Sequence, residues 1–202
     1  MKERWEKIPV AIVADMVTGS LIDPAIRPLR QIGTQPKMFG FALPVTCEGG
    51  DISGLVMALD EIEPGHVLVI AAEGRTDMGM IGGILSGHAR SRGAVGVICD
   101  GAVRDIKEII SWDNFAVYAR GVCARGPAFG NRGKFNLAVT IGGKCIAPGD
   151  LIIGDDDGIA VLRPEQLEGA IDAVEGKLAK EEVWIQRLAD GHTAKQTFEL
   201  AK

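Results

Sequence analysis

The sequence has few aromatic residues and no long apolar run. Aromatic residues make up 5% of the chain, with a single tyrosine. No apolar stretch approaches the roughly 20 residues that a membrane-spanning helix needs. No apolar segment follows the charged residues at the start of the chain, as a signal peptide would require. These absences predict a protein of the cytoplasm with no membrane partner.

Positive charge is also scarce. The chain has 22 lysines and arginines against 27 aspartates and glutamates, a formal net charge of −5. It has no stripe of basic residues with interleaved aromatics, so the sequence predicts no nucleic-acid partner. It also has no G-x-G-x-x-G pattern, which argues against a dinucleotide cofactor.

The cysteines form no recognisable metal or redox motif. None is part of a C-x-x-C pair, and none has a histidine at the spacing of a metal ligand. We therefore expect buried, reduced thiols, as is usual in the cytoplasm. The four cysteines are Cys47, Cys99, Cys123 and Cys145.

Glycine, in contrast, is abundant, with 27 residues dispersed among runs rich in valine, isoleucine and leucine. The chain length favours one domain, residues 1–202. In the middle of the chain, strand-like runs alternate with helix-like periodicity, which indicates a parallel β-α-β unit with a right-handed crossover. The expected elements there are strands at 67–72 and 94–99, helices at 81–92 and 106–111, and a loop at 73–80.

Shorter elements are expected on both sides of this unit. Asp15 is expected to cap a short helix at residues 16–21. Pro164 suits the first position of a C-terminal helix over 164–190. The apolar stripe of that helix extends to Leu188 and needs a partner surface, because two glycines interrupt it. Further strands are expected at 39–45, 115–119, 137–141, 144–147, 151–153 and 159–162, with a helix at 52–61.

A glycine run stands where the expected loop enters the helix at 81–92. Unpaired N–H groups at a helix start, approachable because glycine has no side chain, suit a carboxylate or a phosphate. The same glycines could serve only a tight turn or close packing, and the run alone leaves both possibilities open. The candidate substrate-binding residues are Gly82, Gly83, Ile84 and Leu85; Ile84 and Leu85 also fall on the apolar stripe of this helix.

A second run, from Asp100 to Asp105, follows the second strand of the unit. In open α/β sheets, ligands bind beyond the carboxyl ends of strands, where both runs are placed. Arg104 offers a planar donor fork for a carboxylate or a developing oxyanion. Asp105 offers hard oxygen for Mg²⁺ or Mn²⁺. Alternatively, Asp105 and Glu108 form the N-cap and the capping-box partner of the next helix and have no further role.

Taken together, the two runs resemble those of the RraA-like family, which comprises 4-hydroxy-4-methyl-2-oxoglutarate aldolases and the related regulator of ribonuclease activity A. The most specific match is Asp-Gly-Ala-Val-Arg-Asp at residues 100–105. The resemblance covers most of the chain, roughly residues 15–188. Supporting matches are Pro64-Gly65-His66-Val67-Leu68-Val69, Pro148-Gly149-Asp150-Leu151 and Asp155-Asp156-Asp157-Gly158.

The resemblance implies one compact α/β domain with α/β/β layers, of the swivelling-domain type, that assembles as a homotrimer or hexamer with sites between subunits. In the aldolases, the run matching Gly82, Gly83, Ile84 and Leu85 holds the pyruvate moiety. The arginine matching Arg104 contacts the substrate, and the aspartate matching Asp105 binds the metal. Many of these aldolases carry an acidic residue where this chain has Gly83, whereas the regulatory relatives can lack the acidic residue that matches Asp105.

These features predict a lyase that depends on a divalent metal, Mg²⁺ or Mn²⁺, and cleaves a C–C bond of a small 2-oxo acid to give pyruvate. The reaction would be aldol cleavage of 4-hydroxy-4-methyl-2-oxoglutarate, decarboxylation of oxaloacetate, or both. Arg104 and Asp105 are the expected catalytic residues, with Asp105 holding the metal. No lysine falls in either run, which argues against a Schiff base. The alternative is a non-catalytic protein that regulates an RNA-degrading enzyme through protein contacts. Methyl transfer to a quinone is disfavoured by the lack of a glycine-rich nucleotide loop.

Overall fold

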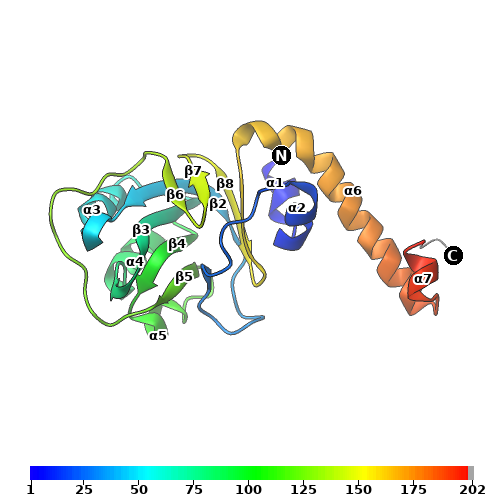
Figure 1. Cartoon of the computed structure of the whole chain (residues 1–202), viewed down its shortest axis with the longest axis horizontal. Coiled ribbons are helices and arrows are strands. Elements are labelled where there is room, and N and C mark those ends of the chain that lie inside the picture. The colour runs from blue at the N-terminus through cyan, green and yellow to red at the C-terminus, as the bar shows by residue number, and fades with distance from the viewer. Residues whose placement is uncertain (200–202) are drawn as a thin grey trace.

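A seven-stranded mixed sheet forms the centre of the protein, which we describe from a computed structural model for residues 1–199 (Figure 1). The strand order is β1-β5-β4-β3-β2-β8-β9, and β6 and β7 form a separate two-stranded sheet. The strands are β1 (Arg27–Pro28), β2 (Met38–Thr46), β3 (His66–Gly79), β4 (Gly96–Val103), β5 (Ala116–Val122), β6 (Val139–Ile141), β7 (Lys144–Ile146), β8 (Leu151–Asp155) and β9 (Gly158–Leu162). The helices are α1 (Lys2–Glu6), α2 (Val10–Met16), η1 (Glu48–Gly50), α3 (Ser53–Leu59), α4 (Gly83–Ser91), α5 (Ile106–Ile109), α6 (Pro164–Ala189) and α7 (Ala194–Thr197).

Helices connect the parallel strands of the large sheet. Strands β2, β3, β4 and β5 pair in parallel in that order. The connections between them pass through α3, α4 and α5, one helix for each crossover. The parallel β-α-β arrangement predicted for the middle of the chain is confirmed, and it begins one unit earlier, at β2. Strands β1, β8 and β9 are antiparallel and complete the two edges.

Two of the parallel strands run further than the sequence predicted. Strand β3 continues to Gly79, so residues 73–80, expected to be a loop, are almost entirely strand. Strand β4 continues to Val103, so Asp100 lies within the strand and not after it. The pairing register between β3 and β4 shifts twice along their length. Irregular pairing of this kind interrupts the alternation by which a strand is recognised, which is why the sequence predicted a loop.

The first apolar run of the chain is helical. The sequence placed a short helix at residues 16–21, whereas α2 ends at Met16 and Asp15 lies inside it. The helix begins directly after Pro9, an extended residue that cannot donate a backbone hydrogen bond. Its side chains Val10 and Val13 are buried in a cluster with residues of β8, β9 and α6. Tertiary packing therefore fixes a helix where β-branched residues are only weak helix formers.

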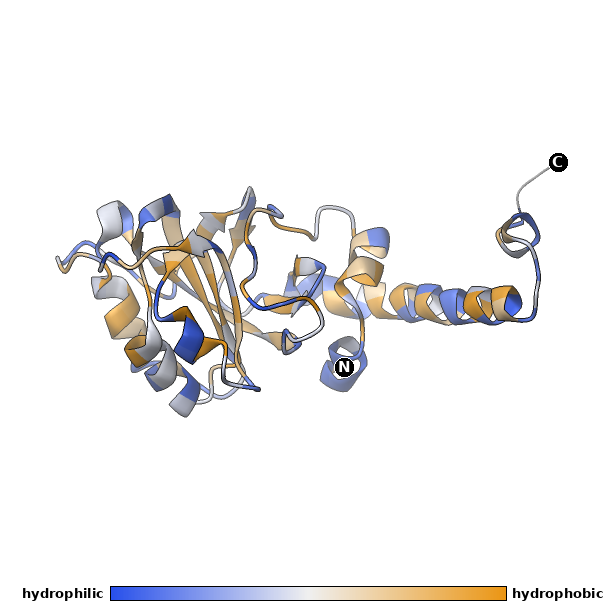
Figure 2. Ribbon diagram, turned by 90° about the horizontal axis from the view of Figure 1, so that it is seen from below, coloured by the Kyte–Doolittle hydropathy of each residue, from blue (hydrophilic) through white to orange (hydrophobic). Residues whose placement is uncertain are grey.

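The large sheet is covered differently on its two faces. On one face, Leu68 and Ile70 of β3 pack in a cluster with residues of α3, α4 and α5. On the other face, Val67 and Ile98 pack with Ile141 of the β6–β7 hairpin. Figure 2 shows the strands between these coverings mostly in the hydrophobic colour. The predicted α/β fold with α/β/β layers is confirmed.

The C-terminal helix is long, and only its first half packs against the body of the protein, whereas its second half contacts α7. Helix α6 leaves the body of the protein, and its far end stands away from the sheet (Figures 1 and 2). Ile171 and Val174 are buried against α1, α2 and β9, which supply the partner surface that the interrupted stripe needs. Further along, Ile185 and Leu188 are exposed, so the predicted stripe is only half used. Neither α6 nor another helix within residues 1–199 is long and apolar enough to cross a membrane.

The cysteines differ in their surroundings. Cys47 and Cys99 are buried, as predicted, and burial raises the pKa of the Cys47 thiol to about 12. Cys123 is half-buried and Cys145 is exposed, so the expectation of burial is wrong for Cys145. Cys145 lies in the short strand β7, where alternate side chains face solvent.

Candidate functional site

Arg104 and Asp105 stand directly after the end of strand β4. Asp105 is also the residue that precedes helix α5. The backbone N–H of Arg104 donates to the carbonyl oxygen of Ile81 at 2.9 Å, and the N–H of Met80 donates to the carbonyl oxygen of Ala102 at 2.9 Å. These bonds join the segment after β4 to the segment before α4. The structure therefore brings together the two runs that the sequence singled out.

The Asp105 carboxylate faces the glycine run. Its Oδ2 atom accepts a hydrogen bond from the backbone N–H of Gly83 at 3.0 Å and lies 3.7 Å from Nε of Arg104. A side chain at Gly82 would collide with this carboxylate, and a side chain at Gly83 would collide with the carboxylate of Glu108. The absence of a side chain at Gly82 therefore permits the close approach of Asp105 to the start of α4, and the absence of one at Gly83 leaves room for the flexible Glu108 side chain.

The capping alternative for Asp105 is wrong. Asp105 occupies the N-cap position of α5, but its side chain accepts no hydrogen bond from that helix. Its backbone is left-handed, with φ 55° and ψ 35°. This conformation is uncommon outside glycine and is found more often at functional sites. Glu108, the expected capping partner, turns its carboxylate toward Gly83 instead.

The start of helix α4 supplies backbone donors to the same place. The first bond of the helix runs from the N–H of Ser86 to the carbonyl oxygen of Gly82 at 3.0 Å. The N–H groups of Ile84 and Leu85 precede that bond and have no acceptor among residues 1–199. Such groups, together with the helix dipole, favour an anion.

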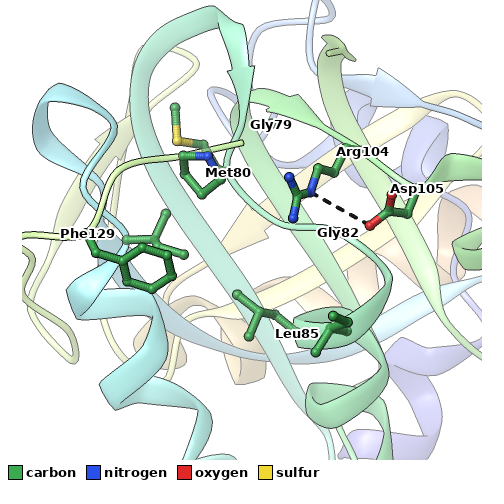
Figure 3. A pocket seen from close by; sticks show the side chains of 10 residues that line it. Gly79, Met80, Gly82, Leu85, Arg104, Asp105 and Phe129 are labelled. Carbon is green, nitrogen blue, oxygen red and sulfur yellow. Dashed lines mark ion pairs between the residues drawn. The ribbon is translucent and has the colours of Figure 1, made fainter. Parts of the chain in front are cut away.

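A cavity of about 240 Å³ opens at this place. Figure 3 shows Arg104 and Asp105 on one side of it, Phe129 and Met80 on the other, and Leu85 below. Gly83 is the one predicted substrate-binding residue that does not line the cavity; it reaches the site through its N–H bond to Asp105. The lining residues are Ile52, Gly79, Met80, Gly82, Ile84, Leu85, Arg104, Asp105, Pro127 and Phe129.

The side chain of Ile84 does not pack inward. The sequence placed it on the apolar stripe of α4, but it is 84% exposed at the rim of the cavity. Leu85 is half-buried and packs against the helix-side core. The apolar stripe of α4 therefore does not pack entirely against the sheet, because Ile84 faces the cavity.

Sequence reasoning missed the loop that closes the far side of the cavity. Phe129 lies between Ala128, whose N–H donates to the carbonyl oxygen of Gly50 at 2.9 Å, and Gly130, whose N–H donates to Asp51 at 3.0 Å. The Asp51 carboxylate also accepts from the N–H of Arg132 at 2.9 Å. These backbone donors, with that of Ser53, lower the pKa of Asp51 to about 2. No local pattern links this loop to the two runs, because the contact is made only in the folded chain.

The first residue of the second run has a different role. Asp100 is 8% exposed and pairs with Arg120, which also contacts Asp23 at 2.8 Å. The hydrogen bond from the N–H of Ala25 and the contact with Arg120 lower the pKa of Asp23. Asp100 does not line the cavity, so the two aspartates of the run face different surroundings.

Residues 10–161 of the chain match the family model described as RraA-like, Aldolase/RraA. The chain belongs to the RraA-like family. The match includes both runs and all ten residues that line the cavity.

Relatives of this RraA-like protein differ in what their names say. A protein of Halalkalibacterium halodurans, named "Putative 4-hydroxy-4-methyl-2-oxoglutarate aldolase", is 30% identical over 96% of this chain and 91% of the relative. The solved structure of Streptomyces coelicolor RraAS2, described as an unusual member of the RNase ES inhibitor RraA family, has a TM-score of 0.78 and 22% identity over 92% of this chain and 96% of its own. An uncharacterized protein of Pseudomonas syringae has a TM-score of 0.83 and 23% identity, over 98% of this chain and 92% of its own. These two structures show the shared fold.

The donor set of the RraA-like site suits a hard divalent cation. Oδ1 of Asp105 accepts no hydrogen bond from residues 1–199, and the side chain is half-exposed at the cavity. Within that part of the chain, no group of three or more histidine, cysteine, aspartate or glutamate residues gathers to hold a metal. A single carboxylate with open space beside it fits Mg²⁺ or Mn²⁺, which keep several waters, better than zinc, which needs three or four protein ligands.

Proposed function

We propose that this protein is a metal-dependent lyase that cleaves a C–C bond of a 2-oxo acid and releases pyruvate. The observation that carries this proposal is the meeting of Arg104, Asp105 and the start of α4 at one side of a small cavity. A guanidinium fork and two unpaired N–H groups suit the carboxylate of such an acid. The relative named as an aldolase supports the same reaction class.

The residues of the chain would act on the substrate in distinct ways. The N–H groups of Ile84 and Leu85 would hold the carboxylate of the substrate, which fixes its keto oxygen beside Arg104. In aldol cleavage, a water molecule at the site would take the proton of the C4 hydroxyl, the C4 carbonyl would form as the C3–C4 bond breaks, and the electron pair of that bond would go to C3 to form the enolate of pyruvate. Arg104 would stabilise the negative charge that develops on the enolate oxygen. Protonation at C3 then gives pyruvate.

Asp105 would hold the divalent cation of this reaction, Mg²⁺ or Mn²⁺. The bond from the Gly83 N–H fixes one oxygen of its carboxylate and leaves the other available. When bound, such an ion supplies Lewis-acid polarisation of the keto oxygen. Glu108 places a second carboxylate against Gly83, where it would accept hydrogen bonds from water at the site.

We further propose that the protein works as a homotrimer or hexamer in the cytoplasm. Apolar side chains are exposed at the mouth of the cavity, where Ile84 is 84% exposed and Phe129 is 77% exposed. Exposed apolar patches of this kind are typical of surfaces that another protein covers. Light scattering of the purified protein after gel filtration measures the assembly, and a monomer at micromolar concentration would contradict it.

The proposed reaction is tested by following pyruvate. Purified protein with Mg²⁺ or Mn²⁺ is given 4-hydroxy-4-methyl-2-oxoglutarate and, separately, oxaloacetate, with and without a chelator. We expect pyruvate release that the chelator abolishes. In Asp105→Ala we expect a loss of about a thousandfold in kcat/KM, because the anchor for the metal is gone. Asp105→Asn keeps the left-handed backbone and the acceptor for Gly83, and serves as the matched control for folding.

Full activity in Asp105→Ala, or activity that the chelator leaves unchanged, would contradict the metal-dependent mechanism. No pyruvate from either compound would favour the regulatory alternative. In that case, binding to an RNA-degrading enzyme of the RNase E type would be the next measurement.

A further inference from the structure

The Glu108 carboxylate occupies the place that a side chain at position 83 would take. A Cβ atom on Gly83 would collide with Oε2 of Glu108 and would lie 3.3 Å from its Oε1. Gly83 is the first residue of α4, and its N–H donates to Oδ2 of Asp105 at 3.0 Å. Two carboxylates, one from Asp105 and one from Glu108, therefore meet at a residue that has no side chain of its own.

The backbone of Glu108 is fixed, although its side chain is exposed. The left-handed backbone of Asp105 turns the chain from β4 into α5, which lies beside α4 (Figure 1). The N–H of Glu108 donates to the carbonyl oxygen of Asp105 at 3.1 Å, and its own carbonyl oxygen accepts from the Ser111 hydroxyl at 2.7 Å. The next residue, Ile109, is fully buried in the helix-side core. The fold therefore holds Glu108 in the first turn of α5, where its side chain reaches the start of α4.

The Glu108 carboxylate is not committed to another group within residues 1–199. It accepts no hydrogen bond there and forms no ion pair, and neighbouring Lys107 pairs with neither Glu108 nor Asp105. Asp105, in contrast, has one oxygen bonded to Gly83 and one that is open. A cation such as Mg²⁺ or Mn²⁺ held by one carboxylate keeps several waters, and those waters need acceptors nearby. An uncommitted carboxylate beside Asp105 is such an acceptor.

We propose that Gly83 and Glu108 act as one unit that sets the affinity of the site for its divalent cation. Gly83 leaves a space at the start of α4, and Glu108 fills that space from α5 with a carboxylate that accepts hydrogen bonds from water on the cation. A carboxylate on residue 83 itself would serve in its place. This inference rests on the proposed function and deepens it, since it assigns the second carboxylate of the same site and gives Gly83 the role of admitting it.

The unit is tested by two routes that remove the same carboxylate. Glu108→Ala deletes it, whereas Gly83→Ala puts a methyl group in its place and displaces the flexible side chain. Gly83 is helical and has no positive φ, so alanine suits its backbone. We expect each variant to weaken Mn²⁺ binding to the assembled protein about tenfold, measured by calorimetry. The double variant should weaken it no further, because the second change has nothing left to remove.

Matched controls carry the same substitutions elsewhere. Gly176→Ala adds a methyl group in open space on α6, and Glu61→Ala removes one exposed carboxylate outside the cavity lining. Both should leave the Mn²⁺ affinity unchanged. Glu108 is exposed, so Glu108→Ala opens no core and decides the test even where a change at Gly83 alters folding.

An exchange of positions gives the sharpest result. In the double variant Gly83→Asp with Glu108→Ala, the carboxylate comes from α4 and not from α5. We expect its Mn²⁺ affinity to return to within about threefold of the unmodified protein. Gly83→Asn with Glu108→Ala has the same shape without the charge, and its affinity should stay low.

Unchanged Mn²⁺ affinity in Glu108→Ala would overturn this inference and leave the proposed lyase intact. Additive losses in the double alanine variant, or no recovery in the exchanged variant, would do the same. Non-additive losses with recovery by exchange, but without release of pyruvate from either compound, would support this inference and overturn the lyase. Absence of Mn²⁺ binding by the unmodified protein would overturn both.

Discussion

The run from residue 100 to residue 105 begins and ends with an aspartate, and each aspartate lies near an arginine. At the first end, Asp100 is almost fully buried and pairs with Arg120, which also contacts Asp23. At the second end, Asp105 is half-exposed and lies 3.7 Å from Arg104 beside the cavity. The same two residue types therefore form a saturated cluster at one end and an open polar site at the other.

The difference between the two ends lies in the partners that each group has. Arg120 contacts two carboxylates, through Nε to Asp100 and through Nη1 to Asp23, so its charge is balanced within the protein. Nε of Arg104 lies 3.7 Å from Asp105, beyond hydrogen-bond distance. The rest of its guanidinium group lies beside the cavity, with Nη1 close to Gly126. Removing one partner of a largely buried ion pair destabilises the fold, whereas an incompletely paired group beside a cavity is available to a ligand. Arginine swaps at the two ends should therefore have opposite consequences.

Between the two arginines, the larger effect on activity is expected from Arg104→Lys. Lysine keeps the positive charge but cannot present two parallel N–H donors to a carboxylate or an enolate. We expect kcat/KM for pyruvate release to fall about a hundredfold. The urea midpoint should stay almost unchanged, because the pair with Asp105 is exposed. Full activity of Arg104→Lys would contradict the proposed role of Arg104 in binding the substrate.

The opposite outcome is expected from Arg120→Lys. A single ammonium group cannot contact Asp100 and Asp23 as the guanidinium does, so one carboxylate loses its partner. We expect the free energy of unfolding to fall by about 2 kcal/mol, measured by urea denaturation. The activity per folded molecule should be retained. A stable but inactive Arg120→Lys protein would contradict this prediction, because it would give Arg120 a role in activity and not in stability.

A smaller effect is expected from Glu108→Gln. This variant tests whether a second carboxylate, besides Asp105, takes part in the open polar site. The Glu108 carboxylate lies against Gly83, so its neutralisation should weaken the site without changing its shape. We expect kcat to fall about tenfold, with a weaker affinity for Mn²⁺ measured by calorimetry. Glu61→Gln, at an exposed residue outside the cavity lining, is the control for loss of one charge. Equal activity of Glu108→Gln and Glu61→Gln would show that Glu108 takes no part in the reaction.

The smallest effect concerns Asp51, a third aspartate that is saturated by backbone donors. Its pKa is about 2 in the folded protein, below the ordinary value of 3.8. The unfolded chain therefore binds more protons as the pH falls from about 4 to about 2, and the contribution of Asp51 to stability is lost over that range. Above pH 4 the contribution is complete. Asp51→Asn should flatten this part of the pH dependence, measured as urea midpoints from pH 7 down to pH 2. An unchanged slope would contradict the role of Asp51 as an anchor.

Local pattern was sufficient for much of the fold. The parallel unit from β3 to β5 follows from strands and helices that alternate at regular spacing, which are short-range features of the sequence. The extension of β3 to Gly79 was not predictable in this way, because its irregular pairing with β4 depends on the partner strand. The start of α2 at Val10 also depended on a partner, since its apolar side chains pack on β8, β9 and α6.

The candidate site divides in the same manner. The sequence by itself determined the glycine run, Arg104 and Asp105, since these residues carry their chemistry in their type and order. Only the tertiary structure decided that Asp105 contacts Gly83 and not its own helix. It likewise decided that Asp100 pairs with Arg120 and that Phe129 lines the cavity. The physical reason is that a residue type fixes which bonds a group can make. Which partner it bonds to depends on contacts between segments far apart in the chain, and these exist only after folding.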